Sequence, residues 1–297
     1  MNRANAADHP SGQRGATFSP AAAVWRSAPA LASYVFLLLV VAVIAGPFVW
    51  LLPNAFKDQT AIYAIPPTWI PSPATFDNVV AAWTQVPFAL FFLNSLKVAG
   101  LVTIGQLVTC SLAAYAFARL RFPGREIIFG IYLSSLMVPG QVTIIPLYIL
   151  MKNLGLVNTH AALILPALAS AFGTFLLRQH FLTIPRELEE AAIMDGAGLL
   201  RVLFLLVLPL SKAALGALAI FTFNTSWNDF FSPLIFLDSP QNLTLPVGLS
   251  ALQGQYGGTS PAVMLAGVCM AVIPVLLIFL FGQRYIVEGI TMTGIKG

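Results

Sequence analysis

Six long apolar runs, separated by shorter polar segments, set the pattern of the chain. Each run is about 20 residues or longer, which is enough for a helix to cross the hydrocarbon core of a bilayer. The apolar positions follow one another without strict alternation, so the pattern predicts helices rather than the strands of a barrel. We therefore expect an all-α integral membrane protein with six transmembrane helices, near residues 30–52, 89–117, 127–151, 159–182, 202–230 and 262–286. Asn, Gly and Pro interrupt the last two runs, which leaves the ends of those spans open by several residues.

The composition excludes a soluble domain. Hydrophobic residues make up 58% of the 297 residues and charged residues only 9%, and the mean hydropathy is +0.84. A soluble domain carries roughly 25% charged residues. Most of this chain is therefore expected to lie in membrane lipid.

The distribution of Lys and Arg predicts the orientation. With the N-terminus in the cytoplasm, the outer side holds only Lys57 and Lys152, and Lys97 falls within the second span. The inner side then holds Arg3, Arg14, Arg26, Arg119, Arg121, Arg125, Arg178, Arg186, Arg201, Lys212, Arg284 and Lys296. Because basic loops stay in the cytoplasm and the number of spans is even, we expect both termini inside. The net charge of +4 is then a topology signal, with some attraction to anionic lipid, and predicts no nucleic-acid partner.

Three parts of the chain follow from this pattern. Residues 1–29 are rich in Ala, Ser, Gly and Pro and are expected to form a disordered cytoplasmic tail. A cleaved signal peptide is the competing interpretation, but the apolar run that starts at Leu31 is longer than the apolar region of a signal peptide. Residues 30–286 form the transmembrane domain, and residues 287–297 are expected to be a cytoplasmic C-terminal tail.

Nothing in the sequence predicts catalysis by this chain. Cys110 and Cys269 lie within predicted spans, where we expect them to be small packing residues rather than a disulfide. No metal-ligand spacing, phosphate-binding glycine loop or nucleophile triad is present in the sequence. We therefore expect no catalytic residue, no metal site and no cofactor bound by this chain.

One short segment, residues 184–209, concentrates charge between the fourth and fifth spans. Pro185 suits the first turn of a helix, and carboxylates are favoured near the N-terminal end of a helix. Gly196 supplies a stop, so the pattern predicts a helix of about ten residues, too short to cross the bilayer. The segment holds four of the 11 acidic residues: Glu187, Glu189, Glu190 and Asp195. Its small alanines suit docking in a groove of another protein, and a plain amphipathic connector is the alternative.

The segment resembles the EAA loop of bacterial ABC importer permeases. The matching positions are Glu190, Ala191, Ala192, Gly196, Leu208 and Pro209, with Asp195 and Ala197 beside the glycine. Leu206 stands where the family usually has Ile. The resemblance implies the type I importer permease fold, in which this loop forms a coupling helix held in a cleft of an ATPase subunit. The implied ATPase-coupling residues are Glu187, Glu190, Ala191, Ala192, Asp195, Gly196, Ala197, Leu208 and Pro209, and ATP and Mg²⁺ are used by the partner ATPases.

Further segments resemble the carbohydrate-importing branch, in particular the shorter six-span permease of maltose and glycerol-phosphate type systems. They are Asn94-Ser95, Trp227-Asn228-Asp229, Pro233-Leu234, residues 245–249, Gln283-Arg284-Tyr285 and residues 289–297. The resemblance implies import of a sugar across the bacterial inner membrane. It implies four kinds of partner: a dimer of ABC ATPase subunits, a second, dissimilar permease, an extracytoplasmic solute-binding protein and membrane lipid. In that branch the short C-terminal tail reaches toward the ATPases, so residues 289–297 are a second candidate contact.

Two alternative functions stay open from the sequence. A permease for peptides, amino acids or other organic solutes has the same loop. An ion-coupled secondary transporter would need internal repeats and buried coupling-ion ligands, for which only Lys97 and Asp229 are candidates.

Polar residues crowd into two turns of the fifth span. Polar groups inside spans often mark a substrate pathway, and a mixture of amides, hydroxyls and aromatic rings suits a sugar. Interhelical hydrogen bonding is the alternative. The predicted pathway residues are Phe221, Asn224, Thr225, Asn228 and Asp229 in this span, together with Asn94 at the start of the second span.

The proline-rich segment 53–87 is too polar for a span and is expected on the outer surface. Its Trp69 and Trp83 are typical of a lipid interface. With residues 231–261 it is predicted to form a platform for the binding protein, and ordinary loop packing is the alternative.

Overall fold

The computed structural model describes residues 20–58, 60–66, 68–254 and 260–294, and within these ranges the chain is helical with no strand. The chain divides into two compact units, Met1–Leu51 and Leu52–Gly297. The helices found throughout the described ranges confirm the all-α fold class. Each unit is described by itself below.

The first unit contains most of helix α1, Pro20–Ala55. Residues 20–29, expected to belong to a disordered tail, are helical instead. Alanine is the strongest helix former and proline is tolerated in the first turn, which accounts for a helix that begins at Pro20. Residues 1–19 lie outside the described part of the chain. The stretch Ala32–Ala55 is apolar and long enough to span a membrane.

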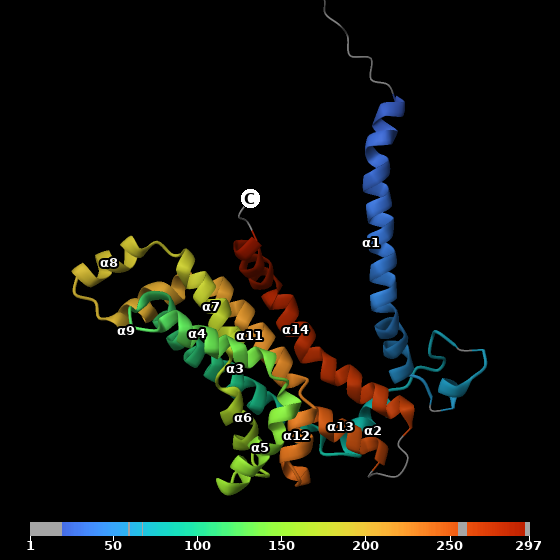
Figure 1. Ribbon diagram of the computed structural model, residues 1–297. Coiled ribbons are helices and arrows are strands. Elements are labelled where there is room, and N and C mark those ends of the chain that lie inside the picture. The colour runs from blue at the N-terminus through green and yellow to red at the C-terminus, as the bar shows by residue number, and fades with distance from the viewer. Residues whose placement is uncertain (1–19, 59, 67, 255–259, 295–297) are drawn as a thin grey trace, which may run out of the picture. The chain divides into compact units, whose positions relative to one another are not determined.

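The second unit holds the remaining helices (Figure 1). They are α2 Asp77–Thr84, α3 Phe88–Arg119, α4 Arg125–Ser134, α5 Gly140–Asn153, α6 Ala161–Ala167, α7 Ala171–Thr183, α8 Arg186–Met194, α9 Leu199–Val202, α10 Leu208–Leu210, α11 Lys212–Trp227, α12 Phe231–Phe236, α13 Leu245–Gly254 and α14 Pro261–Gly294. Single 3₁₀ turns cover Ala61–Tyr63, Ser135–Met137 and Pro240–Asn242, and a π-helical turn covers Leu203–Val207. Figure 1 shows α8 and α9 at one end of this unit and α2, α12 and α13 toward the other.

Among the described residues, four stretches are long and apolar enough to cross a membrane, or up to six if each of two bent pairs is one span. The four are Ala32–Ala55, Phe88–Arg119, Ala161–Thr183 and Pro261–Tyr285. The bent pairs correct the expectation of continuous helices over 127–151 and 202–230. Arg125–Met137 and Gly140–Asn153 meet at 100°, and Leu199–Leu210 and Lys212–Trp227 meet at 82°.

Each bend has a local cause. Pro139 holds an extended backbone and has no N–H to continue the helix before it, and the preceding Val138 is also extended. At the second bend, Ser211 leaves helical geometry with φ −103° and ψ 20°. Its buried hydroxyl donates a hydrogen bond of 2.7 Å to the carbonyl of Val207, which stabilises the bend where the backbone ladder is interrupted.

Helix α3 lies at the centre of the second unit, where it packs against α7 and α11. Gly173 allows this close approach, because a Cβ there would lie 2.9 Å from both the sulfur of Cys110 and a methyl carbon of Leu218. Cys110 is almost fully buried, and both it and Cys269 are free thiols. The prediction that the cysteines pack rather than form a disulfide is confirmed.

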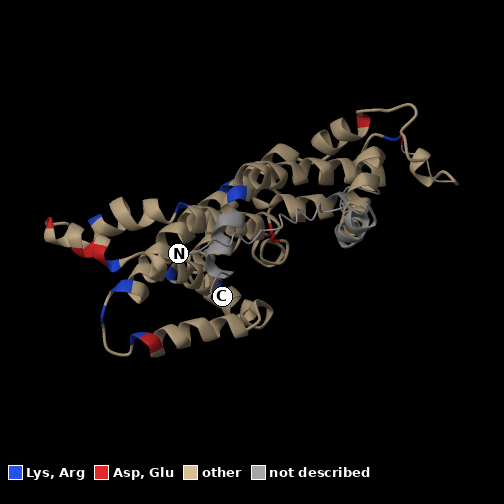
Figure 2. Cartoon of the chain, turned by 90° about the horizontal axis from the view of Figure 1, so that it is seen from above, with Lys and Arg blue, Asp and Glu red and all other residues tan. Residues whose placement is uncertain are grey.

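Helix α14 continues to Gly294. Residues 287–294, expected to be a tail, therefore extend the last helix, since no proline follows Pro274 to stop it. Residues 295–297 lie outside the described part. Figure 2 shows that most charged positions lie near helix ends and in turns, away from the long middles of the helices.

In the segment 53–87, Asn78 of α2 holds the start of the loop. Its amide donates to the carbonyls of Ala55 at 3.0 Å and Lys57 at 2.7 Å. Helix α2 packs against α14, while Trp69 and Trp83 are exposed. The segment therefore has an ordered base and two exposed tryptophans at its surface, of which Trp83 lies against the ring of Phe88 at 5.1 Å.

Candidate coupling site and translocation cavity

The short helix predicted within 184–209 is α8, nine residues from Arg186 to Met194. Pro185 precedes it with an extended backbone, ψ 134°. Glu187 and Glu189 stand in the first turn, where the unpaired N–H groups and the helix dipole favour carboxylates. Pro185 and the acidic first turn therefore account for the start of α8.

The end of α8 explains the spacing of Ala192, Gly196 and Ala197. The N–H of Ala197 donates to the carbonyl of Ala192, and the N–H of Gly196 to that of Ile193, both at 2.9 Å. Gly196 has φ +85°. These two hydrogen bonds and the left-handed glycine form a Schellman motif. An apolar contact at the positions of Ala192 and Ala197 frequently accompanies this motif. Both alanines pack against the core cluster built from α3, α7 and α11.

Gly196→Ala is expected to loosen the end of α8. The left-handed backbone costs an L-residue about 1–2 kcal/mol, whereas the new methyl group itself would meet nothing within 4 Å. We expect amide hydrogen exchange over residues 192–199 to become about 5- to 30-fold faster. Gly198→Ala is the matched control, since Gly198 has φ −73° and equally open surroundings. Equal exchange in the two variants would contradict this account of the motif.

The inner face of α8 is tied down by a buried ion pair. Glu189 Oε1 lies 2.6 Å from Nε of Arg119, at the end of α3, and the two side chains are only 8% and 6% exposed. The hydroxyl of Tyr115 donates to the other oxygen of Glu189 at 3.4 Å. Arg119 Nη2 also donates to the carbonyls of Phe181 at 2.6 Å and Ile184 at 2.7 Å. One guanidinium group therefore joins the end of α3, the end of α7 and the start of α8.

This anchor was missed from the sequence. In the sequence, Glu189 is one of four acidic residues in the segment 184–209, and Arg119 is one of the basic residues that predict the orientation. The available signal was helical spacing, because Glu189 lies three residues before Ala192 and so shares its inward face.

The outer face of α8 is exposed in the described chain. Glu187, Glu190, Ala191 and Asp195 are all exposed, and none of the three carboxylates forms an ion pair with another described residue. Exposed apolar side chains lie among them, with Leu188 45%, Ile193 46% and Met194 87% exposed. Mixed apolar and acidic surface of this kind is typical of a protein-binding site.

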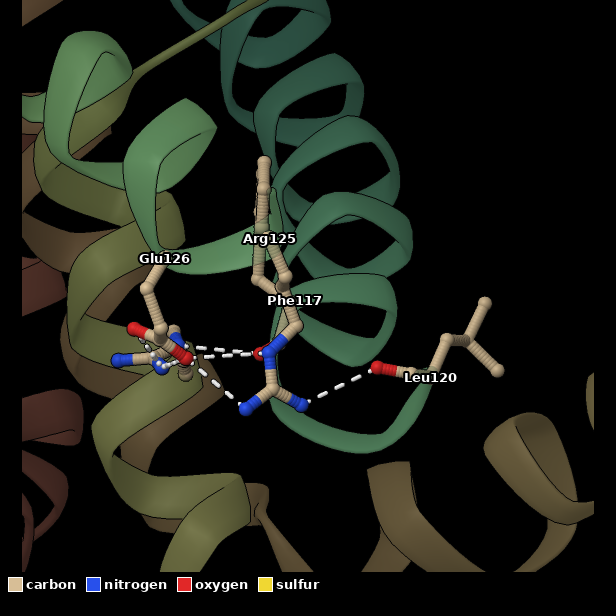
Figure 3. A network of polar contacts seen from close by, with 5 residues as sticks. Phe117, Leu120, Arg125 and Glu126 are labelled. Atoms are coloured by element: carbon tan, nitrogen blue, oxygen red, sulfur yellow. Dashed lines mark hydrogen bonds and ion pairs between the residues drawn. The ribbon is translucent and has the colours of Figure 1, made fainter. Parts of the chain in front are cut away.

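A second polar cluster joins the ends of α3, α4 and α7 (Figure 3). Arg178 of α7 donates to both carboxylate oxygens of Glu126 at 2.9 and 3.0 Å, and to the carbonyl of Phe117 at 3.2 Å. Arg125 donates to Glu126 at 3.0 Å and to the carbonyl of Leu120 at 3.1 Å. Hydrogen bonds between two charged groups are shorter and stronger than neutral ones. This cluster therefore ties the end of α3 and the start of α4 to α7.

The Leu-Pro end of the segment lies directly before the second bend. Leu206 and Leu208 pack against the same core cluster as Ala192, while Pro209 is exposed. Because Pro209 has no N–H to donate, it interrupts the backbone ladder next to the π-helical turn. The arm α9–α10 therefore runs from the end of α8 to the bend that begins α11.

A cavity of about 430 Å³ lies among α3, the α6–α7 region, α11 and α12. Its lining is mixed. Polar side chains come from Gln106, Ser170, Thr222, Thr225, Ser226, Asp229 and Thr244. Phe172 and Phe221 add two aromatic rings that meet edge to face at 6.1 Å. A cavity of this size, with aromatic walls and a few polar groups, suits a small organic ligand.

Three of the predicted pathway residues, Phe221, Thr225 and Asp229, line this cavity. Asp229 also accepts a hydrogen bond from the N–H of Ser232 at 3.1 Å, which caps the start of α12. Gln106 was missed: its amide donates to the carbonyl of Ala167 and its oxygen accepts from Thr222 at 2.9 Å. A glutamine in the middle of an apolar span was the available signal.

The other three do not line the cavity. Asn94 is buried and donates to the carbonyls of Gln241 at 2.8 Å and Leu243 at 2.9 Å, which holds the segment before α13. Asn224 and Asn228 are exposed, and Asn228 donates to the carbonyl and side-chain oxygens of Asn224 at 2.8 and 3.0 Å. The amides of Asn94 and Asn228 thus both bond to oxygens of the protein itself.

A helical membrane domain with a cavity of mixed polar and apolar lining and a short anchored helix at one end is the architecture of a transport permease. Residues 106–291 match the family of binding-protein-dependent transport system inner membrane components, and because this is more than half of the chain, the protein belongs to that family.

Curated relatives support the same assignment. The chain is 36% identical over 274 residues to the probable ABC transporter permease protein YurM of Bacillus subtilis, covering 89% of this chain and 88% of YurM. It is 36% identical over 254 residues to the arabinooligosaccharides transport system permease protein AraQ of Halalkalibacterium halodurans, covering 84% and 91%. It is 34% identical over 264 residues to the sn-glycerol-3-phosphate transport system permease protein UgpE of Yersinia enterocolitica, covering 86% and 94%.

Solved structures show the same fold. A chain from a bacterial ABC transporter involved in the import of the acidic polysaccharide alginate aligns with a TM-score of 0.76 at 22% identity, covering 90% of this chain and 98% of that one. A chain from an alginate ABC transporter in complex with a pentasaccharide-bound periplasmic protein aligns with a TM-score of 0.60 at 16% identity.

Proposed function

We propose that this chain is one of two dissimilar permease subunits of an importer that moves a sugar or sugar derivative into the cytoplasm. Its outer face receives cargo from an extracytoplasmic binding protein, and its α8 docks in a cleft of an ABC ATPase subunit. ATP and Mg²⁺ are used by the ATPase pair, and this chain binds neither. Both termini lie in the cytoplasm of a bacterial cell, as the distribution of Lys and Arg predicts.

One observation carries the docking proposal. Helix α8 is anchored on its inner face by the Arg119–Glu189 pair, while its outer face exposes carboxylates and apolar side chains. A helix that is rigidly held on one side and unpartnered on the other can take up a displacement and pass it on. Closure of the ATPases on ATP would push α8, and the push would travel through Arg119 into α3 and through α9–α10 into α11.

Alternating access would result from a movement of α3 and α11. Both α3 and α11 line the cavity, so a shift of their ends changes which side of the membrane it faces. Hydroxyl and amide groups there, with Phe172 and Phe221, suit the hydroxyl groups and ring faces of a sugar. AraQ is named as a permease of an arabinooligosaccharides transport system and UgpE as one of an sn-glycerol-3-phosphate transport system. These relatives support a sugar or sugar derivative as the cargo.

Uptake in cells tests the cargo class. A strain that lacks this gene should lose uptake of at least one oligosaccharide, sugar or sugar phosphate from a labelled panel, and the cloned gene should restore it. Loss of peptide or amino-acid uptake alone would favour the alternative within the same family.

Phe221→Ala is expected to weaken uptake through the cavity. Loss of one aromatic contact corresponds to about 0.5–1.5 kcal/mol, or a rise of about two- to tenfold in the KM for cargo. Phe231→Ala is the control, because Phe231 is exposed to a similar degree, 45% against 37% for Phe221, and lines no part of the cavity. Unchanged kinetics in Phe221→Ala would remove the cavity from the pathway.

A further inference from the structure

A cleft of about 740 Å³ lies beside the turn that joins α3 to α4 and the start of α8. Three arginines line it, Arg121, Arg125 and Arg186, and one carboxylate, Glu126. Glu126 already forms ion pairs with Arg178 and with Arg125. The charge left over in the cleft is therefore positive.

Two of the arginines have no partner among the described residues. Arg121 and Arg186 are exposed, and neither forms an ion pair or a side-chain hydrogen bond within that part of the chain. Arg125, by contrast, is fixed by Glu126 and the carbonyl of Leu120. The cleft thus has one fixed wall and two free guanidinium groups that can converge on an anion, and guanidinium groups bind phosphate with two parallel hydrogen bonds.

The cleft continues into an exposed aliphatic surface. Ile127 lines it and is 71% exposed, and Ile131, one helical turn further along α4, is 68% exposed. Residues four apart lie on one face of a helix. The same element therefore presents cationic groups at its start and a bare apolar strip along its first two turns.

We propose that this cleft binds the phosphate of an anionic phospholipid, with the acyl chains lying along Ile127 and Ile131. The charge complements a phosphodiester, and the adjoining strip offers acyl chains an apolar contact that a free phosphate ion would not use. Basic clefts at the ends of transmembrane helices are suited to anionic lipid headgroups. The occupied cleft would brace the α3–α4 turn beside the base of α8.

Native mass spectrometry of the chain purified in mild detergent, with any subunits that stay bound, tests this with added phosphatidylglycerol. The double variant Arg121→Gln/Arg186→Gln should bind the lipid about 25-fold more weakly, since each charge contributes about fivefold at a lipid surface. The control Arg201→Gln/Lys212→Gln removes the same charge from exposed positions outside the cleft and should bind like the unaltered chain. Ile127→Asn should also weaken binding with every charge in place.

Other results would overturn the proposal. Equal loss in both double variants would show general attraction to basic surface. Displacement of the lipid by inorganic phosphate, together with no effect of Ile127→Asn, would make the ligand a free phosphate. Full lipid retention in the Arg121/Arg186 variant with loss of a co-purified ATPase would make the cleft a protein contact. No retained phosphatidylglycerol on the unaltered chain would remove the site.

Discussion

Glu189→Ala is expected to abolish import while leaving the chain inserted in the membrane. Removing one member of a buried ion pair leaves the other charge uncompensated and costs about 3–5 kcal/mol. Arg119 would lose its carboxylate at 2.6 Å and Tyr115 its acceptor, so α8 would separate from α3. We expect hydrogen exchange in residues 186–194 to rise at least a hundredfold and cargo uptake to fall to background.

Two matched variants separate the anchor from a general effect of charge. Glu187→Ala removes an exposed carboxylate from the same turn and should change stability by less than about 0.5 kcal/mol. The double variant Arg119→Met/Glu189→Met replaces the pair by apolar groups and should recover part of the lost stability, because no charge is left uncompensated, while the carbonyls of Phe181 and Ile184 still lose their donor. A Glu189→Ala chain with unaltered exchange and uptake would show that the ion pair anchors nothing.

Glu190→Lys is the second change with a large expected effect. Glu190 follows the anchoring Glu189 directly, but a helix turns by about 100° per residue, so its side chain is exposed, and it forms no ion pair within the described chain. Charge reversal within a docked interface costs several kcal/mol, so we expect uptake and cargo-stimulated ATP hydrolysis in proteoliposomes to fall by more than tenfold. Folding should be unchanged, in contrast to Glu189→Ala. A Glu190→Lys importer with normal uptake would place the docking face elsewhere.

The positions of four spans could be predicted, because apolar length alone decides whether a segment can cross a bilayer. The bends could not, since they depend on the backbone at Pro139 and Ser211 within runs that are apolar on both sides. The same limit applied at the ends of the chain, where helix continues through residues 20–29 and 287–294.

Within residues 184–209, the local part of the structure could be predicted and the tertiary part could not. Pro185 and Gly196 mark the ends of α8 by backbone chemistry that belongs to each residue alone. Glu189 has the same side chain as Glu187 and Glu190, and only the position of Arg119, far earlier in the chain, makes it the buried one. The cavity behaves similarly: Phe221 and Thr225 come from one polar run, whereas Gln106 and Ser170 join them through packing of other helices.

The most direct test of the coupling role is purification of the tagged chain in mild detergent, with identification of the proteins that accompany it. The unaltered chain should bring an ABC ATPase and a second permease. Glu190→Lys should lose the ATPase and keep the permease, while Asp238→Lys, the same reversal at an exposed carboxylate near α12, should keep both. A chain that arrives alone, or an ATPase indifferent to Glu190→Lys, would contradict the proposal that α8 couples this permease to ATP.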